Sequence, residues 1–294
     1  MDCHVGSGCR SRPAAHRIGR LVNRALRSGG IEVKPVSPTL PVSDAPGPAS
    51  PRVVPGAGEP RREPDRLSTD LLQTEGEWRA SFAADVSPIL ERHRQQTAST
   101  IAGLRKRYAE PLFGEVRVWD LVERLGSCVD PTDERLYCAS QQMHVRQMLE
   151  EMEADGFATP EMILVALIHD LGKLLLLTDE DPANIVCMNT AVGEHPDGAG
   201  LDNCLIQWNH DEFAFERLKD LIPDELAWLI RYHSIELGHA RRLMNASDLE
   251  RCERLLEPFA HYDHATKTPF HLPAVPLSRY RDVIEEAFPD PIRF

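Results

Sequence analysis

Four histidines and two aspartates are the side chains of this chain whose types and spacing could do chemistry. They follow one another at separations of 25, 1, 40, 23 and 30 residues, each in an apolar or helix-forming neighbourhood: His144, His169, Asp170, His210, His233 and Asp263. Imidazole nitrogens and carboxylate oxygens are ligands that transition metals take in proteins. The pattern therefore predicts a metal site assembled from distant parts of the sequence.

The doublet His169–Asp170 carries most of this prediction. It follows seven apolar residues, Met162–Ile168, and a helix that is apolar on all sides is a buried helix. A polar pair at the end of such a helix costs free energy unless something compensates it. Neighbouring helical residues point about 100° apart, so the pair can address two metals or one metal from two sides. With its two oxygens, Asp170 is the natural bridging ligand.

The composition of the ligand set narrows the choice of metal. Four imidazoles and two carboxylates suit two divalent metals with coordination positions left open. A set of nitrogen and oxygen ligands favours iron or manganese, admits zinc, and disfavours magnesium or calcium.

Helices must position these ligands, because convincing strand alternation is nearly absent. Ligands on facing helices of a bundle point into its core, where metal sites form. The sequence thus predicts an all-α fold, with the segment 181–200 as a loop and the turn Asp130–Asp133 before the first ligand helix. Helical patterns occupy residues 86–108, 116–125, 136–152, 160–169, 202–217, 223–233 and 247–261.

The overall composition excludes several partners. The chain has 33 basic and 46 acidic residues, a net charge of −13, which argues against binding to nucleic acid or an anionic membrane. No apolar run approaches the roughly 18–20 residues of a membrane span. Seven cysteines without a C-x-x-C pair argue against a disulfide framework and indicate a reducing compartment. We expect a cytoplasmic monomer that binds a small molecule.

Residues 1–66 differ from the remainder. They hold 11 basic and 6 acidic residues and 10 of the 23 prolines. Such a segment buries too little apolar surface to offset its chain entropy. The sequence predicts a disordered leader rich in proline and arginine, followed by a helical domain from about residue 76.

Five blocks around the ligands resemble, in order, successive motifs of the myo-inositol oxygenase family, a divergent branch of the HD-domain superfamily. The resemblance runs from about residue 76 to Phe294 and implies an HD-domain-like helical bundle with a buried dinuclear metal site. The blocks are HDLGK (169–173), GLDN (200–203), WNHDEF (208–213), IRYHS (230–234) and DHATK (263–267).

The resemblance implies a non-haem di-iron oxygenase. It implies a mixed-valent Fe(II)/Fe(III) pair, with O2 as co-substrate, that cleaves the ring of myo-inositol or a related polyol to D-glucuronate. Iron is redox active and zinc is not, so this chemistry requires iron. The implied ligands are His144, His169 and Asp263 for one iron, His210 and His233 for the other, and Asp170 as the bridge.

The resemblance also implies the substrate contacts. Lys173 would be catalytic, donating to a substrate hydroxyl and stabilising the alkoxide that forms. Lys267, Ser234 and Asp130 would be further substrate-binding residues. Cationic side chains favour a developing negative charge on oxygen.

One segment departs from the family pattern. The stretch between Lys173 and His210 is shorter than in the family, and Cys187–Met188 stands where the family has a Gly–Asp substrate contact. A site that hydrogen-bonds hydroxyls discriminates strongly through such contacts, so a more apolar, larger or substituted cyclitol is a possible substrate.

Two other functions fit the same ligands. An HD-type metal-dependent phosphohydrolase would use a metal-bound hydroxide against a phosphate ester. A non-catalytic HD-fold binding protein would retain the helices and lose the metal. Oxygen uptake, phosphate release and metal analysis separate the three.

Overall fold

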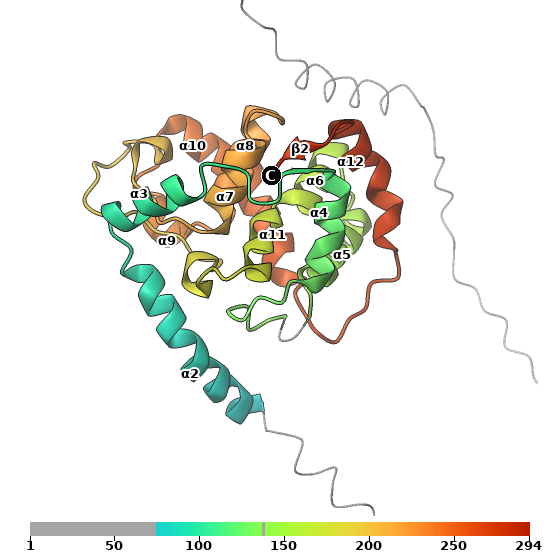
Figure 1. Ribbon diagram of the computed structural model, residues 1–294, viewed down its shortest axis with the longest axis horizontal. Helices are drawn as coiled ribbons and strands as arrows, with labels where there is room; N and C mark the ends of the chain where they lie inside the picture. Colours follow the sequence, from blue (N-terminus) through green and yellow to red (C-terminus); the bar gives the residue numbers. More distant parts are fainter. Residues whose placement is uncertain (1–74, 137–138) are drawn as a thin grey trace, which may run out of the picture.

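The computed structural model describes residues 75–136 and 139–294. The leader predicted for residues 1–66 lies outside the described residues. The α-helices are α2 (Glu75–Arg94), α3 (Ala98–Arg107), α4 (Val118–Arg124), α5 (Gln141–Ala154), α6 (Pro160–Ile168), α7 (His210–Leu218), α8 (Asp224–Tyr232), α9 (Leu237–Ala240), α10 (Ala246–Arg251), α11 (Glu257–Ala265) and α12 (Arg281–Ala287) (Figure 1).

The strand content of the described residues is small. Strands β1 (Glu115–Val116) and β2 (Ile292–Arg293) pair antiparallel, and two isolated bridges join Asn189 to Ile235 and Ala191 to Ile206. The all-α prediction is confirmed. No helix among the described residues is long and apolar enough to cross a membrane.

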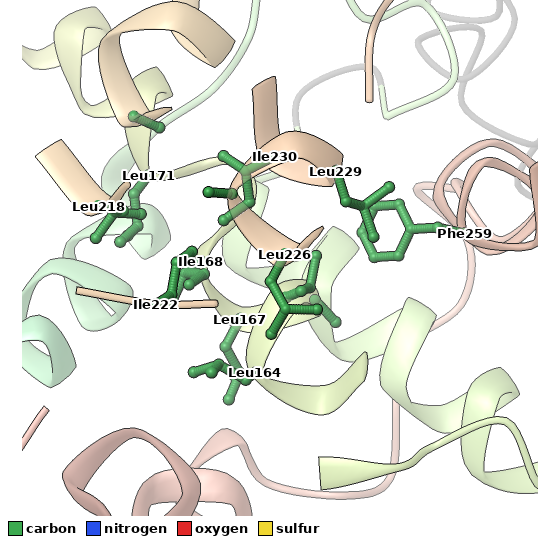
Figure 2. Close-up of a cluster of buried hydrophobic side chains, with 14 of the residues drawn as sticks. Leu164, Leu167, Ile168, Leu171, Leu218, Ile222, Leu226, Leu229, Ile230 and Phe259 are labelled. Atoms are coloured by element: carbon green, nitrogen blue, oxygen red, sulfur yellow. The ribbon is translucent and has the colours of Figure 1, made fainter. Parts of the chain in front are cut away.

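Helix α6 lies at the centre of the core, as its apolar sequence predicts. Thr159 caps it by accepting a hydrogen bond from the backbone of Met162, and Pro160 occupies its first turn, where a missing N–H costs nothing. Figure 2 shows the α6 side chains surrounded by the end of α7, by α8 and by Phe259 of α11. The residues drawn there include Leu164, Leu167, Ile168, Leu171, Leu218, Ile222, Leu226, Leu229 and Ile230. The apolar packing fixes where the helix ends, and so where His169–Asp170 lies.

The helical pattern predicted over residues 86–108 is two helices. Helix α2 ends at Arg94, and Thr97 begins α3 by accepting from the backbone of Thr100. The buried Gln96 between them accepts from the Trp208 backbone N–H (2.8 Å) and donates to the Trp208 carbonyl (2.9 Å). These bonds hold the chain in a bend, which a periodicity argument does not detect.

The helix predicted over residues 202–217 begins only at His210. Before it, the backbone of Gln207 donates to Thr190 (3.0 Å) and that of Val192 donates to Leu205 (2.7 Å). Backbone groups committed to this pairing are unavailable to a helix. Asn209 then caps α7 by accepting from Asp211. The start of the helix is therefore set by a non-local contact.

Candidate metal centre

The six predicted ligands lie at one buried place between the helices. Two sets of ligand atoms, each within 4.8 Å of one another, are formed by His144, His169 and Asp170 and by Asp170, His210 and His233. Asp263 joins the first set, since its Oδ1 lies 2.8 Å from Nε2 of His144 and 3.9 Å from Nε2 of His169. Four helices and the turn after α6 supply these side chains.

Asp170 is common to both sets because its two oxygens face different histidines. Its Oδ2 lies 3.3 Å from Nε2 of His169. Its Oδ1 lies 3.1 Å from Nε2 of His210 and 3.6 Å from Nε2 of His233. A carboxylate that bridges two metals requires this arrangement.

Backbone carbonyls hold three of the histidines in one tautomer. Nδ1 of His169 bonds to the Ala166 carbonyl (2.9 Å) and Nδ1 of His233 to the Ile230 carbonyl (2.8 Å), each three residues earlier in its helix. His210 uses the Ile185 carbonyl (2.6 Å). A carbonyl only accepts, so Nδ1 carries the proton and the Nε2 lone pair faces the centre. Metal-binding histidines are commonly oriented in this way.

The donor atoms at the centre fit a cation. Nε2 of His169 is buried, has no hydrogen-bond partner among the described residues, and faces Oδ2 of Asp170 at 3.3 Å. Nε2 of His210 and Nε2 of His233 are 3.4 Å apart, again lone pair toward lone pair. Such contacts are costly in a buried site unless a positive charge lies between them, and a metal ion supplies that charge.

The pKa of His210 also indicates that the cluster favours a cation. Burial lowers its pKa, but the carboxylates of Asp211 and Asp170 outweigh burial and raise that pKa to about 9. His144 differs, because burial and the positive Lys267 lower its pKa to about 4. The carboxylate side of the cluster thus attracts positive charge, and His144 stays neutral as a metal ligand must.

Asp211 is a site residue that the sequence analysis missed. It is fully buried, and its Oδ1 lies 3.0 Å from Nε2 of His210. Its carboxylate also accepts from the Asn189 amide (3.1 Å) and from the backbone and hydroxyl of Ser234 (3.2 and 3.0 Å). The doublet His210–Asp211 repeats the His169–Asp170 pattern, and that repetition could have identified it.

Lys173 lies beside the centre, one turn beyond the doublet. Its ammonium is fully buried, 3.1 Å from Oδ2 of Asp170 and 3.4 Å from Oδ2 of Asp130. Burial alone would lower the pKa of Lys173, but Asp170 and Asp130 raise it well above its usual value. The residue therefore carries its charge into the interior.

Lys267 occupies a comparable place on the Asp263 side. Its Nζ lies 3.2 Å from Oδ1 of Asp263 and 3.1 Å from Oδ2 of Asp133. Asp133 was not singled out from the sequence, although it ends the same turn as Asp130. Each lysine thus contacts one predicted ligand and one carboxylate of this turn.

The remaining predicted substrate contacts have internal partners. The Ser234 hydroxyl donates to Asp211. Asp130 caps its turn by accepting from the backbone and hydroxyl of Thr132 (2.8 and 2.7 Å), and its other oxygen faces Lys173. Asp130 therefore caps its turn and contacts Lys173, and its contact with the substrate stays a prediction.

Cys187 lies at the same place, at the departure from the family pattern. Its thiol is 3.5 Å from Oδ2 of Asp130. Burial raises the pKa of this thiol well above its usual value, although the positive charge of Lys173 opposes the shift. The side chain is nevertheless accessible to solvent. The thiol therefore contacts a buried carboxylate on one side and solvent on the other.

The fold and the site together are those of an all-helical protein with a buried cluster of metal-ligand side chains. A family model described as myo-inositol oxygenase matches residues 86–187 and 178–294. The chain therefore belongs to the myo-inositol oxygenase family, whose members are oxygenases.

Named relatives agree with this membership. "Inositol oxygenase 2" of Arabidopsis thaliana is 30% identical over 215 residues, covering 60% of this chain and 67% of the relative. "Probable inositol oxygenase" of Oryza sativa subsp. japonica is 27% identical over 242 residues, covering 69% and 78%. "Inositol oxygenase" of Rattus norvegicus is 25% identical over 249 residues, covering 69% and 86%.

Proposed function

We propose that this chain is a non-haem di-iron oxygenase that uses O2 to cleave the ring of myo-inositol or a closely related cyclitol, giving D-glucuronate or its analogue. The observation that carries the proposal is Asp170, whose two oxygens face separate histidine sets while Lys173 approaches the same carboxylate. Family membership supplies the reaction class.

The ligands divide naturally between two ions. His144, His169 and Asp263 would hold one iron and His210 and His233 the other, with Asp170 between them. When bound, an iron pair supplies Lewis acidity and redox chemistry that nitrogen and oxygen side chains lack. Asp211 orients this half of the site by holding Ser234 and facing His210.

Lys173 and Lys267 prepare the site for a substrate that becomes negatively charged on oxygen. Both ammonium groups are held in place by carboxylates, Asp130 and Asp133, from one turn. A fixed, buried cation stabilises developing negative charge more strongly than a solvated one, because it needs no reorganisation. We propose that Lys173 donates to the reacting hydroxyl and that Lys267, Ser234 and Asp130 contact the remaining ring.

Cys187 bears on which cyclitol the site prefers. A thiol is a weak hydrogen-bond donor and a weak acceptor, so the position beside Asp130 recognises a hydroxyl poorly. We propose that the preferred substrate presents a less polar group or a substituent next to Cys187. Residues 76–294 form the catalytic domain in this proposal, and a monomeric, cytoplasmic enzyme stays a prediction.

The test is oxygen consumption by the iron-loaded full chain with myo-inositol and with deoxy or methylated cyclitols, with identification of the uronic acid product. His169→Ala should lose iron and activity. His239→Ala is the matched control, since its side chain is 80% exposed, and it should keep both. The family match does not favour the phosphohydrolase alternative. Phosphate release from nucleotides without oxygen uptake would overturn the proposal in favour of that alternative.

A further inference from the structure

Helix α5 presents a row of three polar side chains to the interior. Gln141, His144 and Gln147 are spaced at three-residue intervals and so share one face, and all three are buried. His144 belongs to the ligand cluster. Gln147 donates to the backbone carbonyl of Thr268 (2.6 Å) and so holds the segment that follows Lys267. Gln141, the third member of the row, contacts Lys173.

Gln141 makes the hydrogen bond that fixes the Lys173 ammonium. Its Oε1 accepts from Nζ at 2.8 Å, the shortest of the three contacts of that nitrogen. The carboxylates of Asp170 and Asp130 lie farther from Nζ, at 3.1 and 3.4 Å. An ammonium has three N–H bonds, so one is held by Gln141 and two can be given to other acceptors.

The orientation of the Gln141 amide is unambiguous. An ammonium only donates, so the amide oxygen must face Lys173 and the NH2 group must face away. In this orientation Nε2 is buried without a partner among the described residues, and a buried donor without an acceptor destabilises the fold. A polar side chain held at such a cost points to a role at the lysine and not to packing.

The base of Gln141 is rigid. Its backbone N–H donates to the Cys128 carbonyl at 2.9 Å, and the preceding Ser140 caps α5 by accepting from Met143. A side chain on a capped first turn has little freedom at its Cα. The amide oxygen is therefore a fixed point against which the long, flexible lysine side chain is set.

We propose that Gln141 is a positioning residue for Lys173, an inference that rests on the proposed function. By accepting one N–H bond of Lys173, it directs the other two toward Asp130 and Asp170. We expect the substrate hydroxyl to bind on this side of the ammonium group. The two longer contacts are the ones that a substrate oxygen can replace. Gln141 thus acts through Lys173 and touches no reacting atom.

The experiment replaces Gln141 by methionine, which keeps the length and removes the acceptor. In the iron-loaded full chain, Gln141→Met should lower kcat at least about tenfold, equivalent to 1.4 kcal/mol. Its KM should change less than about threefold and its iron content should not change, because the lost interaction acts in the transition state. Gln141→Glu restores an acceptor oxygen and should recover most of the lost kcat.

The matched control is Gln142→Met, the same change one residue along. Gln142 is partly exposed, and its amide donates to the Glu123 carbonyl on the outer side of α5. This variant should keep the unsubstituted kcat. An equal loss of kcat in both variants, an unchanged kcat in Gln141→Met, or a change confined to KM overturns the proposal.

A second measurement needs no activity. Thermal unfolding of Gln141→Met, Lys173→Met and the double variant forms a cycle that isolates their interaction. Gln141→Met should lower Tm by several degrees alone and by less when Lys173 is already absent. Additive shifts overturn the positioning role. Absence of oxygen uptake by the unsubstituted chain would refute the proposed function instead, and the cycle would still decide whether Gln141 holds Lys173.

Discussion

Gly172 is the residue at which a single methyl group should disable the site. It lies between the doublet and Lys173, in the 3₁₀ segment η3 (Leu171–Leu177). A Cβ added at this position would lie 1.9 Å from the His210 carbonyl oxygen and 2.6 Å from its carbonyl carbon. Both obstacles are backbone, so no side-chain rotation relieves the clash.

The magnitude follows from this distance. Ordinary contact begins at 3.4 Å, so α7 must move from η3 by about 1.5 Å. A displacement of 1 Å in a catalytic group can cost about a hundredfold in rate, and overpacking costs about 1–3 kcal/mol in stability. Gly172→Ala should therefore lower kcat/KM by at least about a hundredfold, and because His210 moves away from Asp170, iron content should fall by roughly half.

The assay compares oxygen uptake and iron stoichiometry with those of Gly103→Ala. Gly103 is in α3, and an added Cβ there has no atom within 4 Å, so this control should keep full activity. Alanine also favours a helix over glycine by about 1 kcal/mol, so its Tm should not fall. If Gly172→Ala matched the control in iron and rate, the close approach would not be what places His210.

Three further changes test other parts of the site. Lys173→Met should keep the metals and lower kcat by about 10²–10³-fold, the effect of losing one donor to a developing oxyanion. An oxygen electrode measures the rate and iron analysis the metal content, and an unchanged rate would show that Lys173 takes no part in the reaction. Removing metal with a chelator should lower Tm, because a site held at one hundred times its Kd contributes about 2.7 kcal/mol to the free energy of unfolding. Calorimetry before and after Fe(II) is returned measures this change, and an unaltered Tm would count against a structural metal pair. Deleting residues 1–66 should leave kcat and Tm unchanged, and an inactive truncation would assign the leader a role.

The sequence predicted the buried helix and the candidate ligand residues from local patterns. Seven apolar residues before His169 have only one stable environment, and a polar doublet at their end needs a partner. The six side chains then converge because each follows or lies within a helix that must bury its apolar face. Burial of the whole set in one place is therefore a consequence of the packing pattern.

The contacts between these segments were not predictable in the same way. The bend at Gln96 and the late start of α7 depend on hydrogen bonds between residues at least 13 positions apart. Gln141 has no sequence signal, because a glutamine at the start of a helix is usually solvated. Only the lysine that meets it across 32 positions gives it a role.

The deep placement of the two site lysines has a practical consequence for labelling. The chain contains only five lysines, and those at the centre, Lys173 and Lys267, have side chains that are 0% and 5% exposed. Lys106 and Lys219 lie on the outside. Amine-reactive dyes, cross-linkers and immobilisation resins should therefore attach to the periphery and spare the reactive interior, so the folded protein can be tethered through its amines while its turnover is recorded.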